Sequence, residues 1–293
     1  MNVLHHKDTI HVVSSADDNY AHHLGVMLAS LLTNVDKNRR VMLYVIDGGI
    51  KKPNKRMLMK TTMQFGVPIR FLSIDTESYK NATESRYINK TAYYRISIPE
   101  VITDPSVERV IYIDCDTLVL TDIAQLNDID LDGNLMAAVE DAGQLQRLEK
   151  MNITTEGKYF NSGMMVIDME GWRKQNISNR VLQFIDENND PDFLYLHDQD
   201  ALNAILWDKW KPIHPKWNAQ SFIILKTKTP RELVERKRYK EARQSPAIVH
   251  FTGANKPWNS DVGHPFAPLY FEFLQQTPWK VLPEKKEQEV YAD

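Results

Sequence analysis

The feature that most constrains the fold is an alternation, over residues 10–113, of short apolar runs with segments of helical periodicity. The runs are rich in β-branched side chains and cover residues 10–13, 41–46, 69–74 and 110–113. Residues 20–32 repeat apolar side chains at helical spacing, and residues 51–65 also have a helical pattern. Strands that alternate with helices indicate parallel βαβ units, and continuous apolar strands indicate burial on both faces. We therefore expect an α/β fold with a central sheet flanked by helices.

The pattern becomes less regular after residue 135. Residues 135–139, 164–167 and 247–251 are typical of strands, and residues 172–187 and 198–207 are typical of helices. No internal repeat or linker divides the chain, so we predict one domain over residues 1–277. Residues 278–293 carry many charges and few apolar anchors, which predicts a flexible tail.

Composition limits the classes of function. The 36 Lys and Arg residues against 39 Asp and Glu residues give a net charge of −3, so no general positive field attracts nucleic acid. Cys115 is the only cysteine, which is consistent with a reducing compartment. The N-terminus lacks the apolar core of a signal peptide, and no run approaches the ~18 apolar residues that span a bilayer. We expect a cytoplasmic protein with no transmembrane segment and no nucleic-acid partner; peripheral attachment at the inner membrane surface is left open.

Two aspartates follow the apolar run at residues 110–113, in the sequence Asp114-Cys115-Asp116. If the extended conformation continued, both carboxylates would point the same way, because strand side chains alternate. They would lie at the carboxyl end of a parallel strand, where α/β sheets bind ligands. Adjacent carboxylates repel unless a cation lies between them, so the pattern predicts a divalent metal. The alternative is an acidic turn after a strand.

Other acidic motifs fit less well. An EF-hand loop requires Gly at its sixth position, where this chain has Val119. A phosphatase with an aspartate nucleophile usually has Gly-Thr after the second aspartate and lies near the N-terminus, whereas Asp116 is followed by Thr117-Leu118. The phosphatase alternative stays open.

A later apolar run, at residues 246–251, brings His250 to the end of a predicted strand. Gly253 permits close approach of the backbone to a ligand, and Lys256 supplies a positive charge for phosphate. A lone histidine at a strand end is more often structural, but two carboxylates with an imidazole suit Mn²⁺ or a similar ion. Asp114, Asp116 and His250 are therefore the candidate metal ligands.

Six stretches, in this order, resemble glycosyltransferase family 8, the retaining family that includes glycogenin and the bacterial lipooligosaccharide α-galactosyltransferases. They are Ser15–Tyr20, Thr91–Arg95, Tyr112–Asp116, Tyr159–Gly163, His197–Asn203 and His250–Trp258. The resemblance covers about residues 10–275. It implies a GT-A fold, with a Rossmann-like mixed or parallel central sheet, and a catalytic domain over residues 1–277.

The resemblance also implies a UDP-sugar donor, either UDP-glucose or UDP-galactose, and Mn²⁺, with Mg²⁺ as the alternative ion. Asp114, Asp116 and His250 look like the ligands of this metal. The nucleotide and its diphosphate would contact Ser15, Asp17, Asn19, Cys115, Gly253 and Lys256. For Asp17 and Asn19 the alternative is a helix N-cap, since both residue types cap well.

The donor sugar would lie among Arg95, Asp114, Asp141, Asn161, Asp198 and Gln199. Considered alone, Arg95 could form a surface salt bridge, Asn161 could serve a turn, and Asp198 could begin a helix. Gln199 matches the position beneath the anomeric carbon, and an amide is a poor nucleophile. We therefore expect front-face transfer with retention, with Asp198 as a transient nucleophile left open.

These implications together predict a retaining, Mn²⁺-dependent hexosyltransferase that acts on an unidentified acceptor, such as a glycan or glycolipid. Two other classes remain. A metal-dependent nucleotide-sugar hydrolase or phosphatase would need no acceptor, and a non-catalytic UDP-binding stress protein would show no turnover.

Overall fold

The computed structural model describes residues 9–79, 90–144, 146–154, 157–188, 190–228, 230, 233–259 and 263–281. The strands are β1 (Thr9–Ala16), β2 (Arg40–Asp47), β3 (Ile69–Leu72), β4 (Arg109–Ile113), β5 (Thr117–Val119), β6 (Met136–Glu140), β7 (Phe160–Asp168), β8 (Trp210–Pro212), β9 (Ala219–Gln220) and β10 (Ile248–His250). The α-helices are α1 (Ala21–Asn34), α2 (Lys52–Met63), α3 (Ile98–Val101), α4 (Ala124–Asn127), α5 (Arg147–Lys150), α6 (Met169–Lys174), α7 (Ile177–Glu187), α8 (Asp198–Leu206), α9 (Ser221–Ile224), α10 (Leu233–Gln244) and α11 (Ala267–Gln275). The 3₁₀ helices are η2 (Thr76–Tyr79), η3 (Lys90–Ser97) and η4 (Pro215–Asn218).

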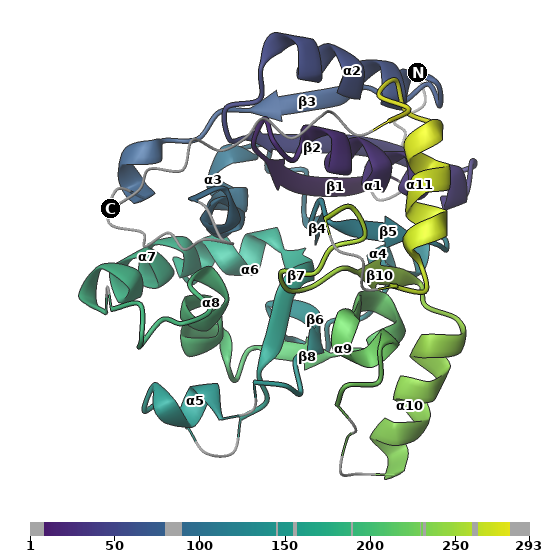
Figure 1. Cartoon of the computed structure of the whole chain (residues 1–293). Helices are drawn as coiled ribbons and strands as arrows, with labels where there is room; N and C mark the ends of the chain where they lie inside the picture. The colour runs from purple at the N-terminus through teal and green to yellow at the C-terminus, as the bar shows by residue number, and fades with distance from the viewer. Residues whose placement is uncertain are drawn as a thin grey trace, which may run out of the picture.

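The larger sheet has seven strands, in the order β3-β2-β1-β4-β7-β6-β8 (Figure 1). Strands β1 to β4 run parallel, as the alternation of strands and helices in the first 113 residues predicts. Strand β7 runs antiparallel to both of its neighbours, β4 and β6. The sheet is therefore mixed, and the predicted α/β fold with flanking helices is confirmed.

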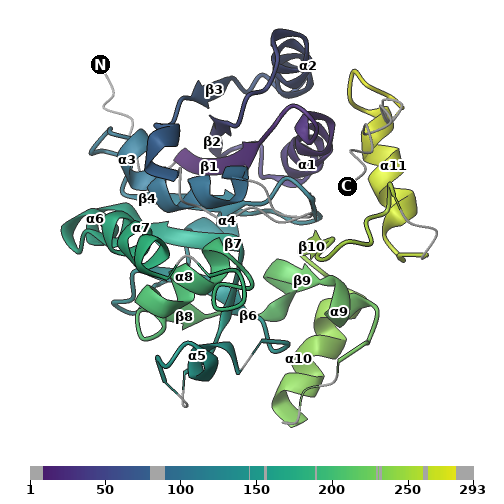
Figure 2. The ribbon, with the colours of Figure 1, turned by 60° about the vertical axis from the view of Figure 1, so that its left-hand side comes forward.

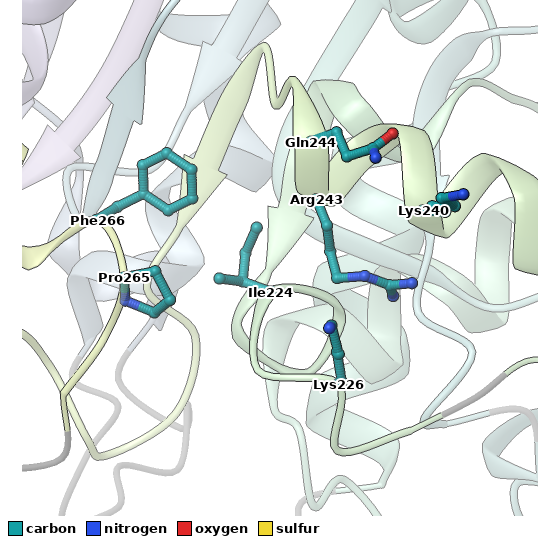
Figure 3. A pocket seen from close by; sticks show the side chains of 7 residues that line it. All are labelled: Ile224, Lys226, Lys240, Arg243, Gln244, Pro265 and Phe266. Carbon is teal, nitrogen blue, oxygen red and sulfur yellow. The ribbon is translucent and has the colours of Figure 1, made fainter.

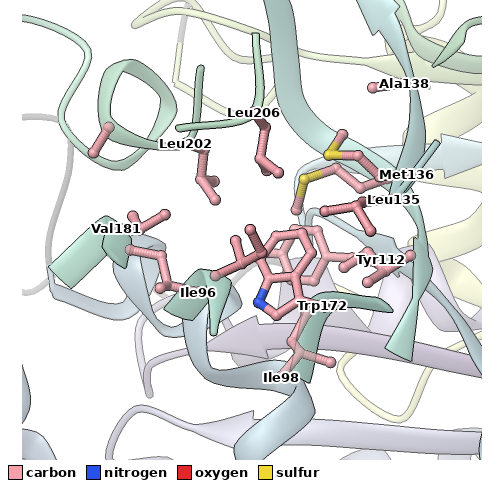
Figure 4. Close-up of a cluster of buried hydrophobic side chains, with 14 of the residues drawn as sticks. Ile96, Ile98, Tyr112, Leu135, Met136, Ala138, Trp172, Val181, Leu202 and Leu206 are labelled. Atoms are coloured by element: carbon pink, nitrogen blue, oxygen red, sulfur yellow. The ribbon is translucent and has the colours of Figure 1, made fainter. Parts of the chain in front are cut away.

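Alternate residues of the central strands enter two hydrophobic cores, one on each face of the sheet. Val12 and Ile111 pack with α1 and α2, whereas their neighbours Val13 and Tyr112 pack with α6, α7 and α8. Figure 2 shows these two groups of helices on opposite sides of the sheet. In the core that includes α6, α7 and α8, Trp172 of α6 lies beside Tyr112 (Figure 4). Burial on both faces explains why these strands are continuously apolar.

A second sheet, of order β5-β10-β9, joins residues that are far apart in the sequence. In its central strand, His250 lies opposite Thr117 of the antiparallel β5 and opposite Gln220 of the parallel β9. Because β5 begins directly after Asp116 and β10 ends at His250, this small sheet brings the two residues to the same place.

Residues 172–187 form two helices, so the prediction of one helix is wrong. Helix α6 ends at Lys174, and α7 begins at Ile177 after Asn176, which has a left-handed backbone with φ 52°. Asparagine tolerates this conformation better than most residues. The break also lets the Trp172 indole N–H donate to Ser178 Oγ over 3.0 Å.

The predicted C-terminal tail is described only at its start, because residues 282–293 lie outside the described ranges. Trp279 packs against α1, where a Cβ added to Gly25 would lie 2.6 Å from the indole ring. The domain boundary at residue 277 and the flexibility of the tail stay predictions. No helix in the described part of the chain is long and apolar enough to cross a membrane.

Candidate active site

The predicted metal ligands Asp114, Asp116 and His250, hereafter the acidic cluster, lie together where the two sheets meet. One ligand atom from each residue can be chosen so that all three atoms lie within 4.8 Å of one another. His250 Nε2 is 3.3 Å from Asp116 Oδ1 and 3.8 Å from Asp114 Oδ2. The extended geometry predicted for the two aspartates is wrong, since β4 ends at Ile113 and the chain turns before β5. The carboxylates converge across a turn.

A glycine keeps the space beside this cluster open. A Cβ added to Gly163 would lie 2.2 Å from His250 Cε1 and 2.6 Å from Asp114 Oδ2. The Asp114 backbone N–H donates to Gly163 O over 2.8 Å, which fixes the neighbouring strand β7 at this distance. Any side chain at residue 163 would therefore displace two members of the acidic cluster.

The tautomer of His250 follows from hydrogen bonds that begin at a backbone donor. The Gly163 N–H donates to Asn161 Oδ1 over 3.1 Å, and Asn218 Nδ2 donates to the same oxygen over 2.8 Å. Asn218 Oδ1 therefore faces His250 Nδ1, 2.9 Å away, and accepts a hydrogen bond from it. With the proton on Nδ1, the lone pair of Nε2 is left on the side of the two aspartates. A histidine that binds a metal through Nε2 needs this tautomer.

Arg95 links the acidic cluster to the predicted sugar site. Its side chain is buried, so the alternative of a surface salt bridge is wrong. Arg95 Nη2 lies 3.0 Å from Asp114 Oδ1, and Nε lies 3.1 Å from Asp198 Oδ2. Nη1 also donates to Ser162 O over 2.8 Å. Burial alone would lower the pKa of Arg95, but Asp114 and Asp198 outweigh this effect and raise it, so the guanidinium stays charged.

The side-chain amide of Gln199 is held by two hydrogen-bond donors and one acceptor. Its Oε1 accepts from the Ser162 backbone N–H over 3.1 Å and from Asn161 Nδ2 over 3.0 Å, and its Nε2 donates to Asp141 Oδ2 over 3.4 Å. Burial raises the pKa of the Asp141 carboxyl above its usual value. Asn161 lies in strand β7, so the alternative that it serves a turn is wrong.

Asp198 begins helix α8, as the helix-start alternative predicts, and it also faces the site. Its Oδ2 lies near Arg95 and accepts from Ser162 Oγ over 3.4 Å. Burial raises the pKa of Asp198 to about 6, against the opposing effect of Arg95. The preceding residue, His197, has a left-handed φ of 53°, an uncommon conformation that often occurs at functional sites.

The predicted nucleotide residues of the β1–α1 loop lie at the carboxyl end of β1, which is parallel to β4. Ser15 Oγ is 3.0 Å from the Tyr112 hydroxyl, which donates to Asp114 Oδ1 over 2.7 Å. Asp17 Oδ1 accepts from the Tyr20 N–H over 2.9 Å and so holds the turn that leads into α1. The N-cap residue of α1 is Tyr20, and no side chain caps the helix, so the N-cap alternative for Asp17 and Asn19 is wrong. Asn19 is exposed.

The remaining predicted nucleotide residues surround Asp116. Lys256 Nζ lies 2.5 Å from Asp116 Oδ2, so the ammonium group forms an ion pair with a carboxylate of the acidic cluster. Burial alone would raise the pKa of Asp116, but the ammonium group of Lys256 holds it well below its usual range. Gly253 has φ 84°, a conformation that favours glycine. The Cys115 side chain packs toward the core beneath α1, and burial raises the pKa of its thiol, which stays neutral.

Four further residues complete the site and had no predicted role: Tyr112, Ser162, Gly163 and Asn218. The first three lie within stretches that carry the family resemblance, but the resemblance assigned roles only to neighbouring residues of those stretches. Asn218 lies at the end of η4, outside all six stretches, and its contact with His250 depends on the second sheet. Nothing in the local sequence points to it.

The chain belongs to glycosyltransferase family 8, because the model of that family, described as Glycosyl transferase family 8, matches residues 11–262. It is 60% identical over 277 residues to general stress protein A of Bacillus subtilis strain 168, a match that covers 94% of this chain and 97% of that protein. It is 25% identical over 278 residues to the lipopolysaccharide 1,3-galactosyltransferase of Salmonella typhimurium strain LT2, covering 93% of this chain and 80% of that enzyme.

Among solved structures, the galactosyltransferase LgtC in complex with donor and acceptor sugar analogs aligns with a TM-score of 0.82 and 25% identity. The match covers 94% of this chain and 98% of LgtC. The fold is therefore of the GT-A type, as the resemblance predicts.

Proposed function

We propose that this protein is a retaining glycosyltransferase that moves glucose or galactose from a UDP-sugar to a hydroxyl group of a glycan or glycolipid. The observation that carries the proposal is the meeting, in a family 8 chain, of the acidic cluster with Arg95, Asp198 and Gln199. Relatives described as lipopolysaccharide galactosyl- and glucosyltransferases support hexose transfer. The complex of LgtC with donor and acceptor sugar analogs supports a site for two sugars.

The residues of the acidic cluster fit a divalent metal. Two carboxylates and a neutral imidazole form a donor set that suits Mn²⁺, and Mg²⁺ is the alternative because it accepts carboxylate oxygens. Asn218 leaves the lone pair of His250 Nε2 available, and Gly163 leaves room beside the ligands. When bound, the metal would neutralise the charge that develops on the UDP diphosphate as it leaves. Lys256 supplies a further positive charge at the same place.

The chain's own residues orient the donor sugar and leave no side chain well placed to attack it. Both hydrogen bonds that Gln199 Oε1 accepts come from fixed groups, and Asp198 is paired with Arg95. We therefore propose front-face transfer, in which the acceptor hydroxyl bonds to the anomeric carbon as the leaving phosphate oxygen takes its proton. Holding donor and acceptor together supplies much of the rate. A transient bond to Asp198 is the alternative.

A panel of nucleotide sugars tests the proposal. We expect UDP release from UDP-glucose or UDP-galactose in the presence of Mn²⁺, with a faster rate when a sugar acceptor is added. NMR of the product should show an α linkage. Hydrolysis that no acceptor accelerates would favour a nucleotide-sugar hydrolase, and binding of UDP without turnover would favour a non-catalytic protein.

A further inference from the structure

The chain has a strongly basic segment that the proposed chemistry does not use. Residues 226–244 contain eight Lys or Arg residues and three Glu residues, although the whole chain has a net charge of −3. The segment follows helix α9 and includes helix α10. Figure 2 shows both helices next to β9, away from α1 and α2.

Part of this segment surrounds a hollow, hereafter the basic hollow. Its volume is about 500 Å³, and its lining residues are Ile224, Lys226, Lys240, Arg243, Gln244, Pro265 and Phe266 (Figure 3). A smaller cavity of about 150 Å³ shares Lys226 and Arg243 with it and adds Arg236. Among the residues that the structure describes, no aspartate or glutamate lines either cavity. Three cationic side chains therefore line the basic hollow, and Arg236 lines the cavity beside it.

Carboxylates of the fold do not compensate these four charges. Among the residues that the structure describes, Lys226, Lys240, Arg236 and Arg243 form no ion pair. The two described acidic residues of α10 have other partners: Glu235 lies 2.7 Å from Arg238, and Glu241 lies 3.0 Å from His214. A group of unpaired cations around a hollow is suited to an anionic ligand.

The backbone at Lys226 gives independent support. Lys226 follows α9 with a left-handed φ of 57°, at a position where helices commonly have glycine. A lysine is strained in this conformation, and such strain often accompanies function. Lys226 lines both cavities. A binding role of its side chain explains why lysine occupies a position that the backbone disfavours.

Helix α9 contacts both the basic hollow and the chain segment that carries His250. The Ser221 N–H, at the start of α9, donates to Thr252 Oγ1 over 3.1 Å, and the preceding residue, Gln220, pairs with His250. On the other side, Lys228 Nζ donates to Gly143 O over 3.3 Å and lowers the pKa of Asp141, against the raising effect of burial. Two residues of the same basic segment thus have different neighbours: Lys226 lines the hollow, and Lys228 lies near Asp141 of the predicted sugar site.

We propose that the basic hollow binds a phosphate group carried by the acceptor, which makes a phosphorylated sugar or a phospholipid headgroup the acceptor class. This inference rests on the proposed function, because it assigns the group to the acceptor of that reaction. The Arg243 guanidinium can bind phosphate through paired N–H donors, and the ammonium groups of Lys226 and Lys240 add charge. The volume is within the range of small-molecule sites.

Binding measured without turnover tests the site. UDP and Mn²⁺ are added in excess to occupy the active site, and the probes are glucose 6-phosphate, glucose, and vesicles of phosphatidylcholine with or without equimolar phosphatidylglycerol. Calorimetry measures the sugars, and flotation measures the vesicles. The variants are Lys226→Gly and the pair Lys240→Gln with Arg243→Gln. The control is Lys60→Gln, which removes an exposed charge from α2.

We expect one phosphate-bearing probe to bind, and glucose and neutral vesicles not to bind. The double variant should weaken this binding about 10-fold or more, as loss of charged hydrogen bonds does, and Lys60→Gln should not change it. Lys226→Gly should weaken binding while the Tm stays equal or rises, because glycine relieves the strained backbone. Binding of glucose 6-phosphate alone assigns a sugar phosphate, and binding of the anionic vesicles alone assigns a lipid headgroup.

Failure of both phosphate probes, or equal binding by the double variant, would overturn the basic hollow as a phosphate site. UDP release by the wild-type protein is measured separately with neutral acceptors. Its absence counts against the proposed function and leaves the binding results unchanged, so the two failures are distinguishable.

Discussion

The acidic cluster and the basic hollow are both charged, and they differ in how the fold compensates their charges. In the acidic cluster, Arg95 pairs with Asp114 and Lys256 pairs with Asp116. In the basic hollow, the described part of the chain places no carboxylate on the cations that line it. The cluster is therefore organised without a ligand, whereas the described residues leave the charge of the hollow unbalanced.

This difference separates two kinds of binding. A ligand of the acidic cluster enters a site whose side chains are already held, and it competes with Lys256 for Asp116. A ligand of the basic hollow meets long Lys and Arg side chains that no carboxylate of the described residues holds, and ordering such side chains costs conformational entropy. Substitutions in and around the cluster should consequently have large effects on activity, and those in the hollow smaller effects on acceptor affinity.

The largest effect is expected for Asp116→Asn. The substitution removes a ligand charge and leaves the Lys256 ammonium without its partner, so Mn²⁺-dependent UDP binding should be lost. His250→Ala should weaken binding by about 10-fold or more. Calorimetry of UDP with and without Mn²⁺ measures both, and the exposed Asp192→Asn is the control. Unchanged Mn²⁺-dependent affinity in Asp116→Asn would refute the metal assignment.

The next effect is expected for Gln199→Ala. Loss of a positioned polar group near a developing charge commonly reduces the rate by about 10²–10³. In front-face transfer, the slower variant should still give an α-linked product from the α-configured UDP-sugar, which NMR of the product checks. A covalent adduct with Asp198 or Gln199, trapped with a slow donor and detected by mass spectrometry, would instead support double displacement. A β-linked product would contradict retention altogether.

The sequence predicts the first half of the fold well because the signals there are local. Strands β1 to β4 coincide with largely apolar runs, and α1 and α2 have their own periodicity. The antiparallel direction of β7 depends on its pairing with β4 and β6, which no local pattern encodes. The break at Asn176 was likewise hidden, because asparagine is compatible with a helix as well as with a turn.

The candidate site divides in the same way. Asp114 and Asp116 follow a clear strand, and His250 ends another, so spacing and residue type predict them. Their meeting depends on the pairing of β5 with β10, and the role of Asn218 depends on η4 lying beneath His250. Arg95 had no signal for burial, because its ion pairs are with residues 19 and 103 positions away. Tertiary contacts decided these points.

Asn218→Ala tests whether the organisation of the acidic cluster depends on the residue that holds His250. The variant removes the acceptor that holds the proton on His250 Nδ1. Loss of such a partner typically weakens metal affinity about 10–100-fold. Titration with Mn²⁺ measures this change, and ¹⁵N NMR should show mixed tautomers of His250 in the variant.

The matched control for this change is Gln220→Ala. Gln220 is also a buried amide and lies two residues later, in β9, but its side chain donates to Glu140 O over 3.2 Å. The control should keep both the Mn²⁺ affinity and the histidine tautomer. Equal losses in the two variants would indicate general damage to the second sheet.

A smaller effect is expected on stability, from Asp198. Its pKa of about 6 in the folded protein exceeds the ordinary value of 3.8. Between these values the folded protein keeps a proton that the unfolded chain releases, so the free energy of unfolding falls as pH rises. Relative to Asp198→Asn, the wild-type protein should lose about 1–3 kcal/mol between pH 4 and pH 7. Urea denaturation measures the difference, and a constant or rising difference would contradict the raised pKa.

The smallest effect is expected for Asp17, which the family resemblance assigns to the nucleotide base. Its Oδ1 accepts from the Tyr20 N–H, and the family resemblance also assigns it to the uracil. Asp17→Ala should cost about 1 kcal/mol of stability, as loss of one hydrogen bond commonly does, while Asp17→Ser keeps an acceptor and most of the stability. Both should lose preference for UDP over ADP and GDP by about 10-fold if the carboxylate also reads the base. Thermal shifts with each nucleotide and Mn²⁺ measure this preference, because stabilisation follows ligand concentration relative to Kd. If Asp17→Ser keeps the full preference for UDP, Asp17 serves only the turn into α1.

The wild-type protein supplies a second test. Equal thermal shifts with all nucleotides would show that neither Asp17 nor Asn19 recognises the base.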